Sequence, residues 1–599
     1  MGVKGLQGFV INACPGACTV VNLKEMAEKH VISHPDSSPI IVVDAMCCLR
    51  HWYTPDFWVC GGQWREFLAS LEDFIKAFTT VGIKLVFFFD GVVEQKKRDE
   101  WVKRRLKNNK EIARIFQFIK TNKQQPGRGM FFIPSGLATF TRFALKALGQ
   151  ETICSLQEAH YEVASYGLQN NCMGILGEDT YYLIYDTSPY LSISKLCLDR
   201  MTTVMFSRQN LCYTLGLNVT DLPLFACLLG NDIVPEGAME GFRNKCVASY
   251  SSKSQGYDKR TNTILAVSKY ISNVPCSYNS LKDLEDVGKS MCPPSEQIAK
   301  EQHARAESYM VYNVLSSGEV ECSNTLEDGD DTELPAQALV YHPARQHIYS
   351  ILLESRKDAC GIYPVVKEWF VYAGNPLKQP ELVHPVQLDT PGGTPSLRTL
   401  WLSKEPQVKM QRYCTFLACF HLQDMAEELQ ALETPVAAVC CLLIYLNVQV
   451  DSLSLEDLNA FVAQTLCLQG KSAAQLKDLQ LAQVDSRAVH LGFLFIRGLT
   501  TLVTANSACG FPFNMDDLMP WHVFDGKLFQ EKYQQSHRRC SVEEVFEGNE
   551  GNFFLKIQAG QGGWGVSPLP PAQPGRGRGE EFFYSIDFSG DIPPLKSME

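Results

Sequence analysis

Three continuous apolar runs in the first part of the chain constrain its fold more than any other feature. They read PIIVVDAM (residues 39–46), GIKLVFFFDG (82–91) and MGILGED (173–179), and an acidic residue closes or nearly closes each one. Runs rich in β-branched and aromatic residues, without polar alternation, are typical of strands that are buried on both faces. Such strands form parallel sheets covered by helices. Because helical segments separate these runs over the first 240 residues, we predict an α/β fold there.

The acidic residues after these runs are expected to meet at one edge of the sheet. Ligand sites of parallel sheets lie at the carboxyl ends of the strands, so Asp44, Asp90 and Asp179 would point into one crevice. Glu158 in SLQEAHYEVASYG and Asp232 in ACLLGNDIVPEG stand at similar strand or helix ends. A carboxylate cluster on a rigid sheet suits a pair of divalent ions that cleaves a phosphodiester. Taken singly, each acid also suits a helix cap or a turn.

A basic helix is predicted over KKRDEWVKRRLKNNK (residues 96–110), where Lys103, Lys107 and Lys110 share one face. Two interpretations stay open, a solvated surface helix and an arch that contacts phosphates. The whole chain carries a net charge of −11, so any affinity for nucleic acid must come from such a local patch.

Composition and spacing divide the chain into four regions. We expect an α/β domain over residues 1–250, a linker rich in Ser, Asn and Pro over 251–304, a mixed, helix-rich C-terminal domain over 305–545, and a disordered tail rich in Gly and Pro over 546–599. No membrane partner is expected, because the apolar run 436–446 is shorter than the roughly 20 residues that span a bilayer.

Capping signals place two helices in the region 305–545. One begins with Thr434 as cap and Pro435 at the first helical position. The other has Ser454 as cap, Asp457 three residues later and Gly470 as its stop.

Residues 1 to about 240 resemble the flap endonuclease and XPG-type nuclease superfamily. The blocks that carry the resemblance occur in family order: MGVKGL, VVDA, FFFDG, QEAHYEVA, LGEDTYYLIY and LLGND. The resemblance implies a PIN-like parallel sheet flanked by helices, with the five acids named above at its metal-binding positions. It also implies that Lys97 and Arg104 match the basic arch positions that contact the scissile phosphate.

Two substitutions separate this chain from the family pattern. Where the family reads E-A-E/D-A, the chain has Glu158, Ala159 and His160, and where the family reads D-x-D, the second acid is Tyr181. A neutral imidazole is a poor Mg²⁺ ligand, and a tyrosine with a pKa near 10 stays protonated. We therefore expect vestigial carboxylates, no catalytic residues and no cofactor. The alternative is one residual Mg²⁺ or Mn²⁺ site, which would use Asp44, Asp90 and Glu158.

A second resemblance runs to about residue 540 and concerns one branch of this superfamily, the nuclear-receptor coactivators. It rests on blocks such as DEWVKRRLKNNKEI, FFIPSGLATFTRFALKALGQET, ESYMVYNVLSSGEVECSNTLED and PGGTPSLRTLWL. It implies a protein of the nucleus that activates transcription and promotes adipogenic programmes. The implied partners are peroxisome proliferator-activated receptor gamma, retinoid X receptor and estrogen receptor. Because the chain has no L-x-x-L-L motif, we expect the receptor to meet another surface, in residues 305–545.

Two alternatives stay open at this point. The chain could bind RNA or single-stranded nucleic acid through the basic side chains Lys97, Lys103, Arg104 and Lys107. It could also be a nuclease with a residual dependence on metal ions.

Overall fold

The computed structural model describes the following residues: 2–54, 61–91, 93–130, 132–134, 136–156, 158–250, 258–273, 308–390 and 393–548. Most of the predicted linker and nearly all of the predicted tail lie outside them.

A seven-stranded sheet organises the first part of the chain, with the strand order β1-β7-β6-β5-β2-β3-β4. The three apolar runs are its central strands β2 (Ile40–Asp44), β3 (Lys84–Phe89) and β5 (Gly174–Gly177), and β2 pairs in parallel with both others. Two more parallel strands flank them, β4 (Glu151–Cys154) beside β3 and β6 (Tyr190–Ser192) beside β5. The predicted parallel sheet is confirmed.

Two antiparallel strands extend this sheet beyond the prediction. They are β7 (Thr202–Phe206), which pairs with β6, and β1 (Cys18–Asn22), which pairs with β7 and forms one edge. Neither is a continuous apolar run, so the signal that identified the central strands is absent from them.

Both faces of the central strands are buried, as the unbroken apolar runs require. Successive side chains of a strand point to opposite faces. Accordingly, Ile41 and Val43 belong to one hydrophobic cluster, whereas Val42 between them belongs to another.

Helices cover the two faces of the sheet. One face packs against α3 (Ala45–Trp52), α4 (Trp64–Thr80) and α6 (Leu137–Ala147). The other packs against α1 (Leu6–Ala13), α7 (Ala159–Gln169), α9 (Leu222–Leu229) and α11 (Lys259–Ser272). The remaining helices of this part are α2 (Leu23–Ser33), the long basic helix α5 (Arg98–Asn122), α8 (Arg208–Leu215) and α10 (Glu240–Ser249).

The C-terminal part is rich in helices, as predicted, and holds one small sheet. Its main helices are α14 (Tyr309–Ser316), α16 (His342–Leu353), α18 (Pro406–Ala418), α20 (Thr434–Gln449), α21 (Leu455–Gln469), α23 (Ser486–Ala508) and α25 (Gly526–His537). The sheet has the order β10-β9-β8, from β8 (Glu319–Cys322), β9 (Val366–Phe370) and β10 (Glu381–Val383).

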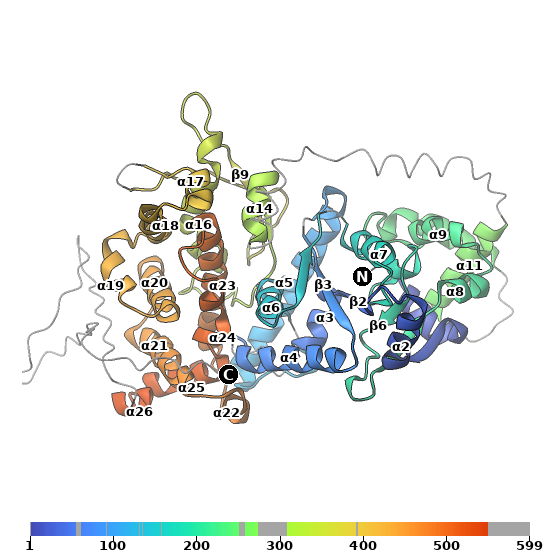
Figure 1. The fold of residues 1–599 in the computed structure, drawn as a ribbon, viewed down its shortest axis with the longest axis horizontal. Coiled ribbons are helices and arrows are strands. Elements are labelled where there is room, and N and C mark those ends of the chain that lie inside the picture. The colour runs from blue at the N-terminus through green and yellow to red at the C-terminus, as the bar shows by residue number, and fades with distance from the viewer. Residues whose placement is uncertain are drawn as a thin grey trace, which may run out of the picture.

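One hydrophobic cluster joins the sheet to the C-terminal helices. It includes Phe87 of β3, Phe140 of α6, Leu442 of α20 and Phe495 of α23, all of them buried. Figure 1 shows α5 and α6 between β3 and α23. The predicted domain boundaries stay a prediction, and the described residues on either side of them share this cluster.

Hydrogen bonds and one close packing contact also join the first part of the chain to the C-terminal part. The guanidinium of Arg65 on α4 donates to the carbonyl oxygens of Trp521 at 2.9 Å, Leu468 at 2.7 Å and Lys471 at 2.5 Å. Gly61 lies against the ring of Phe524 with a φ of +93°, where a Cβ atom would approach that ring to 2.7 Å. Glycine is therefore required at this close approach.

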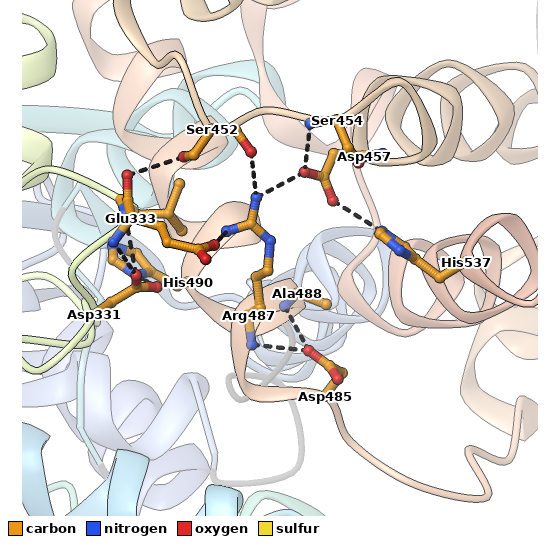
Figure 2. Close-up of polar contacts among 11 residues, drawn as sticks. Asp331, Glu333, Ser452, Ser454, Asp457, Asp485, Arg487, Ala488, His490 and His537 are labelled. Atoms are coloured by element: carbon orange, nitrogen blue, oxygen red, sulfur yellow. Dashed lines mark hydrogen bonds and ion pairs between the residues drawn. The ribbon is translucent and has the colours of Figure 1, made fainter.

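A polar network at the start of α23 ties three segments of the C-terminal part together (Figure 2). Arg487 donates to Asp457 and to the carbonyl oxygen of Ser452, both at 2.9 Å, and lies 3.5 Å from Glu333. His537 of α25 lies 3.0 Å from the other oxygen of Asp457. Asp457 is fully buried, so these two partners stabilise its carboxylate.

Helix α23 is long and apolar enough to cross a bilayer by those two criteria, yet 94% of its most apolar window is buried within the protein. A helix at the centre of a protein core is buried to the same extent and passes the same two criteria.

Candidate functional site

Four of the predicted site acids lie at neighbouring strand ends, as the sequence indicated. Asp44 is the last residue of β2, Asp90 directly follows β3, Glu158 precedes α7, and Asp179 follows β5 by two residues. Three of them also cap a helix. Asp44, Glu158 and Asp179 accept hydrogen bonds from backbone N–H groups at 3.1, 2.8 and 2.9 Å, respectively. These acids therefore have a local structural role in addition to their common location.

His160 lies at the centre of three of these carboxylates. Its Nδ1 is 2.6 Å from Glu158 Oε1, and its Nε2 is 3.3 Å from Asp179 Oδ2 and 3.9 Å from Asp44 Oδ2. The imidazole is buried, with 9% of the residue exposed. Burial alone disfavours its charge, but Asp179 and Glu158 outweigh this and hold the pKa of His160 well above its ordinary value. His160 is therefore an imidazolium that neutralises the cluster.

Lys97 supplies a second cation. Its Nζ lies 2.8 Å from Glu158 Oε1, and 5.9 Å above the ring of Tyr181. Burial favours the neutral form of Glu158, yet His160 and Lys97 lower the pKa of this carboxyl to about 2. The pKa of Asp179 is likewise held below its usual range, because His160 overcomes the effect of burial. Both acids are ionised and paired with cations of the chain itself.

Two tyrosines complete the cluster. The hydroxyl of Tyr182 donates to Asp44 Oδ2 at 2.8 Å, and the hydroxyl of Tyr181 accepts from the N–H of Asp232 at 3.4 Å. Burial is the main reason that the pKa of each phenol is raised, so both are protonated. Tyr181 thus links the end of β5 to the backbone of Asp232 through a neutral hydroxyl.

The donors present do not fit the pair of divalent ions that the nuclease resemblance implies. The carboxylate oxygens that would bind metal already contact an imidazolium, an ammonium or a phenol O–H. Among the residues that the structure describes, no group of three or more His, Cys, Asp or Glu side chains is arranged to hold a metal ion. A metal ion would have to displace His160 or Lys97 from their carboxylates.

Asp90 and Asp232 stand apart from these ion pairs. Both line a cavity of about 330 Å³ that lies between the strand ends and the C-terminal part. Asp90 is open to this cavity but otherwise surrounded by protein, and this burial raises its pKa to about 6. The structure therefore brings Asp232 to the site, although 53 residues separate it from Asp179 in the sequence.

The predicted basic residues divide into two groups. Lys97 and Arg104 line the cavity, whereas Lys103 and Lys107 on α5 are exposed. The three residues predicted to share one face of the helix, Lys103, Lys107 and Lys110, are all exposed, whereas the two residues named from the nuclease resemblance, Lys97 and Arg104, line the cavity.

Sequence reasoning missed the cationic role of His160 and the position of Arg142, which lines the cavity from α6. The sequence indicated only that His160 stands where the family pattern has an acid. Its position two residues after Glu158 is the sequence signal that could have indicated an internal ion pair.

Comparison with known proteins places the chain among coactivators. A family model described as FAM120A-like domain matches residues 215–314. The constitutive coactivator of peroxisome proliferator-activated receptor gamma from Bos taurus is 53% identical over 92% of this chain and 93% of that protein. The Homo sapiens protein of the same name is 42% identical over 92% of this chain and 91% of its own length.

Among solved structures, the catalytic core of Rad2 in complex with DNA substrate is 17% identical and covers 55% of this chain and 92% of that chain, with a TM-score of 0.30. The sequence identities to the coactivators extend over nearly the full length of both partners. The chain therefore belongs to the family of the constitutive coactivators of peroxisome proliferator-activated receptor gamma.

Proposed function

We propose that this chain is a transcriptional coactivator of nuclear receptors that acts in the nucleus as a scaffold and does not cleave nucleic acid. The observation that carries the receptor role is the 42–53% identity to relatives named as coactivators of peroxisome proliferator-activated receptor gamma, over 92% of the chain. Retinoid X receptor and estrogen receptor are further proposed partners, and adipogenic transcription is the proposed programme.

The ion pairs at the strand ends support the scaffold role. Two-metal catalysis needs free carboxylate oxygens beside the substrate. Here His160 and Lys97 hold those oxygens at 2.6–3.3 Å, from within the chain. The carboxylates then stabilise the fold, and coactivation does not require them to bind an ion.

A reporter assay tests this function. Co-expression of the full chain with peroxisome proliferator-activated receptor gamma should raise transcription from a receptor-dependent promoter, and the receptor should co-precipitate with the chain. The variant Asp90→Asn should preserve both effects, because Asp90 takes no part in the ion pairs. Removal of residues 546–599 should also preserve them, since we place the receptor contact in residues 305–545.

Two results would contradict the proposal. One is the absence of both co-precipitation and activation by the parent chain. The other is cleavage of flap or single-stranded substrates by the parent in Mg²⁺ or Mn²⁺, which would support the nuclease alternative.

Binding of nucleic acid is the second candidate function, favoured by the exposed Lys103 and Lys107 on α5. Affinity for single-stranded RNA that falls steeply with salt, and falls further in a Lys103→Ala, Lys107→Ala variant, would support it.

A further inference from the structure

The cavity beside the strand ends has walls from both parts of the chain. They include Tyr309 of α14, Cys322 of β8 and Thr504 of α23, together with residues of the strand edge, α5 and α6. In an open α/β sheet, the edge at the carboxyl ends of the strands receives the ligand. The volume of about 330 Å³ falls in the range of small-molecule sites.

Several charged side chains of the wall are paired within the protein. Glu158 contacts Lys97 at 2.8 Å and His160 at 2.6 Å. Glu321 lies 2.6 Å from Arg98 of α5. These charges are balanced from within the chain and require no ligand.

Asp232 lines the same cavity, and its carboxylate has no such partner. The residue is only 7% exposed. Its backbone N–H contacts the hydroxyl of Tyr181, but no described residue forms a hydrogen bond or an ion pair with its carboxylate. A buried carboxylate is costly unless a cation pairs with it. The cavity therefore favours a positively charged group beside Asp232.

Arg105 of α5 supplies an unpaired charge of the opposite sign. Its guanidinium has no ion pair with a described acid, and its Nε is buried without a hydrogen-bond partner. The guanidinium lies 5.3 Å from the ring centre of Trp101, which also lines the cavity. Burial and the neighbouring Arg104 lower the pKa of Arg105 to about 10, so the residue is still charged at neutral pH. A negatively charged group is therefore favoured beside Arg105.

The wall has an apolar component in addition to these two charges. Trp101, Met310 and Val503 all line the cavity. Each CH₂ group that a ligand buries against such side chains contributes about 0.8 kcal/mol. A ligand that fits this cavity therefore has a cationic group, an anionic group and a hydrocarbon part.

We propose that the cavity binds a free amino acid with an apolar side chain, whose ammonium pairs with Asp232 and whose carboxylate pairs with Arg105. An ammonium has donors only, which suits the acceptor oxygens of Asp232. A guanidinium matches a carboxylate in geometry and charge. Asp90 lines the same cavity and adds to the negative potential that attracts the ammonium.

Calorimetric titration of the full chain tests this site. The probes are L-leucine and L-methionine. Each is compared with the amine that lacks its carboxylate and the acid that lacks its ammonium, which for leucine are 3-methylbutylamine and 4-methylpentanoate. We expect saturable binding of an amino acid with a dissociation constant below about 1 mM, and binding of its two counterparts that is weaker by about tenfold or more. Absence of binding by both amino acids at this level would overturn the proposal. So would a counterpart that binds as tightly as its amino acid.

Two variants locate the charges of the bound ligand. Asp232→Asn should weaken binding of the amino acid about tenfold or more, since it removes the anion and keeps a side chain of the same size. Arg105→Gln should weaken binding to a similar extent, because it removes charge-assisted hydrogen bonds. Asp99→Asn and Arg114→Gln are the matched controls, since both residues are exposed on α5, and they should bind like the parent.

The variants also provide contradicting results. Equal affinity in the parent and in either Asp232→Asn or Arg105→Gln would exclude the proposed site. The melting temperature of unliganded Asp232→Asn should stay the same or rise, because a buried carboxylate without a partner is removed. A lower melting temperature with unchanged binding would show a structural role for Asp232 and overturn its part in the site. If Asp232→Asn does not fold, the comparison of each amino acid with its amine and its acid in the parent still decides the proposal.

Discussion

His160 shows how a single residue changes the chemistry of a carboxylate cluster. The sequence predicted the loss of an acid at this position and therefore a weaker metal site. The structure adds that the replacing side chain contacts Glu158 at 2.6 Å and Asp179 at 3.3 Å as a cation. Spacing along the chain could not predict this, because the charge of an imidazole depends on neighbours that only the fold brings together.

Restoring the family's acid should make the fold depend on metal ions. His160→Asp places a fourth carboxylate beside Asp44, Glu158 and Asp179 and removes their cation. We expect the free energy of unfolding in EDTA to fall by about 3–5 kcal/mol, with partial recovery in Mn²⁺ or Mg²⁺, as measured by denaturant unfolding. The parent should be equally stable with EDTA and with Mn²⁺.

A neutral replacement separates loss of the cation from addition of an acid. His160→Asn should be less destabilised than His160→Asp, and divalent ions should not restore its stability. If Mn²⁺ stabilises the parent as strongly as His160→Asp, then His160 does not act as the resident cation.

At the scale of single elements, the reliability of sequence-based prediction followed the strength of the local signal. The helix α21 has the predicted cap, with Ser454 and Asp457 forming a capping box and Gly470 at the end. The helix α20 begins at Thr434 with Glu433 as its cap, so the prediction of Thr434 as cap is wrong by one residue. The short strands β4 and β6 carry no continuous apolar run and are defined mainly by their pairing with β3 and β5.

The cap of α25 should make stability depend on pH. Asp525 is fully buried, accepts from the N–H of Leu528 at 2.9 Å, and leaves its Oδ2 without a hydrogen-bond partner among the described residues. Burial raises its pKa from 3.8 to about 7. The folded protein therefore binds this proton more tightly than the unfolded chain. Ionisation of Asp525 thus costs stability as the pH rises from about 4 through about 7.

Asp525→Asn removes this titration and keeps a good capping residue. We expect the free energy of unfolding of the variant, relative to the parent, to increase between pH 4 and pH 7.5 by up to roughly 4 kcal/mol. Denaturant unfolding at several pH values measures this change. Asp525→Ala should show the same relative pH trend with lower stability throughout, because it also loses the cap. A pH slope in Asp525→Asn equal to that of the parent would contradict the assignment.

At the scale of the whole molecule, sequence composition predicted domains over 1–250 and 305–545, and these boundaries stay a prediction. The structure adds a hydrophobic cluster that described residues of both regions share. Composition could not predict this contact, because the sequence pattern of an apolar helix face does not indicate which other segment packs against it. Arg142 was missed for the same reason, because only the folded chain brings it from α6 to the cavity that Arg104 and Arg105 of α5 also line.

The shared cluster should make the described parts unfold as one unit. We expect Arg65→Ala to lower stability by about 2–3 kcal/mol, because three backbone carbonyl oxygens of the C-terminal part lose their donor. Thermal unfolding followed by circular dichroism and by tryptophan fluorescence should give one coincident transition in the parent and in the variant. Arg65→Lys should be intermediate, since it keeps the charge but has fewer fixed donors. Two separate transitions in the parent would show that the regions unfold independently.

The ion pairs of His160 and Lys97 also have a consequence for the life of the protein in a cell. A site that recruits its cations from solution is complete only while the surrounding pool can supply them, and its occupancy changes with that pool. In this chain the cations are the side chains of His160 and Lys97, so every molecule carries them together with the acids from its synthesis onward. The shape of this strand edge, and of any surface that depends on it, should therefore be the same in compartments that differ widely in magnesium or manganese.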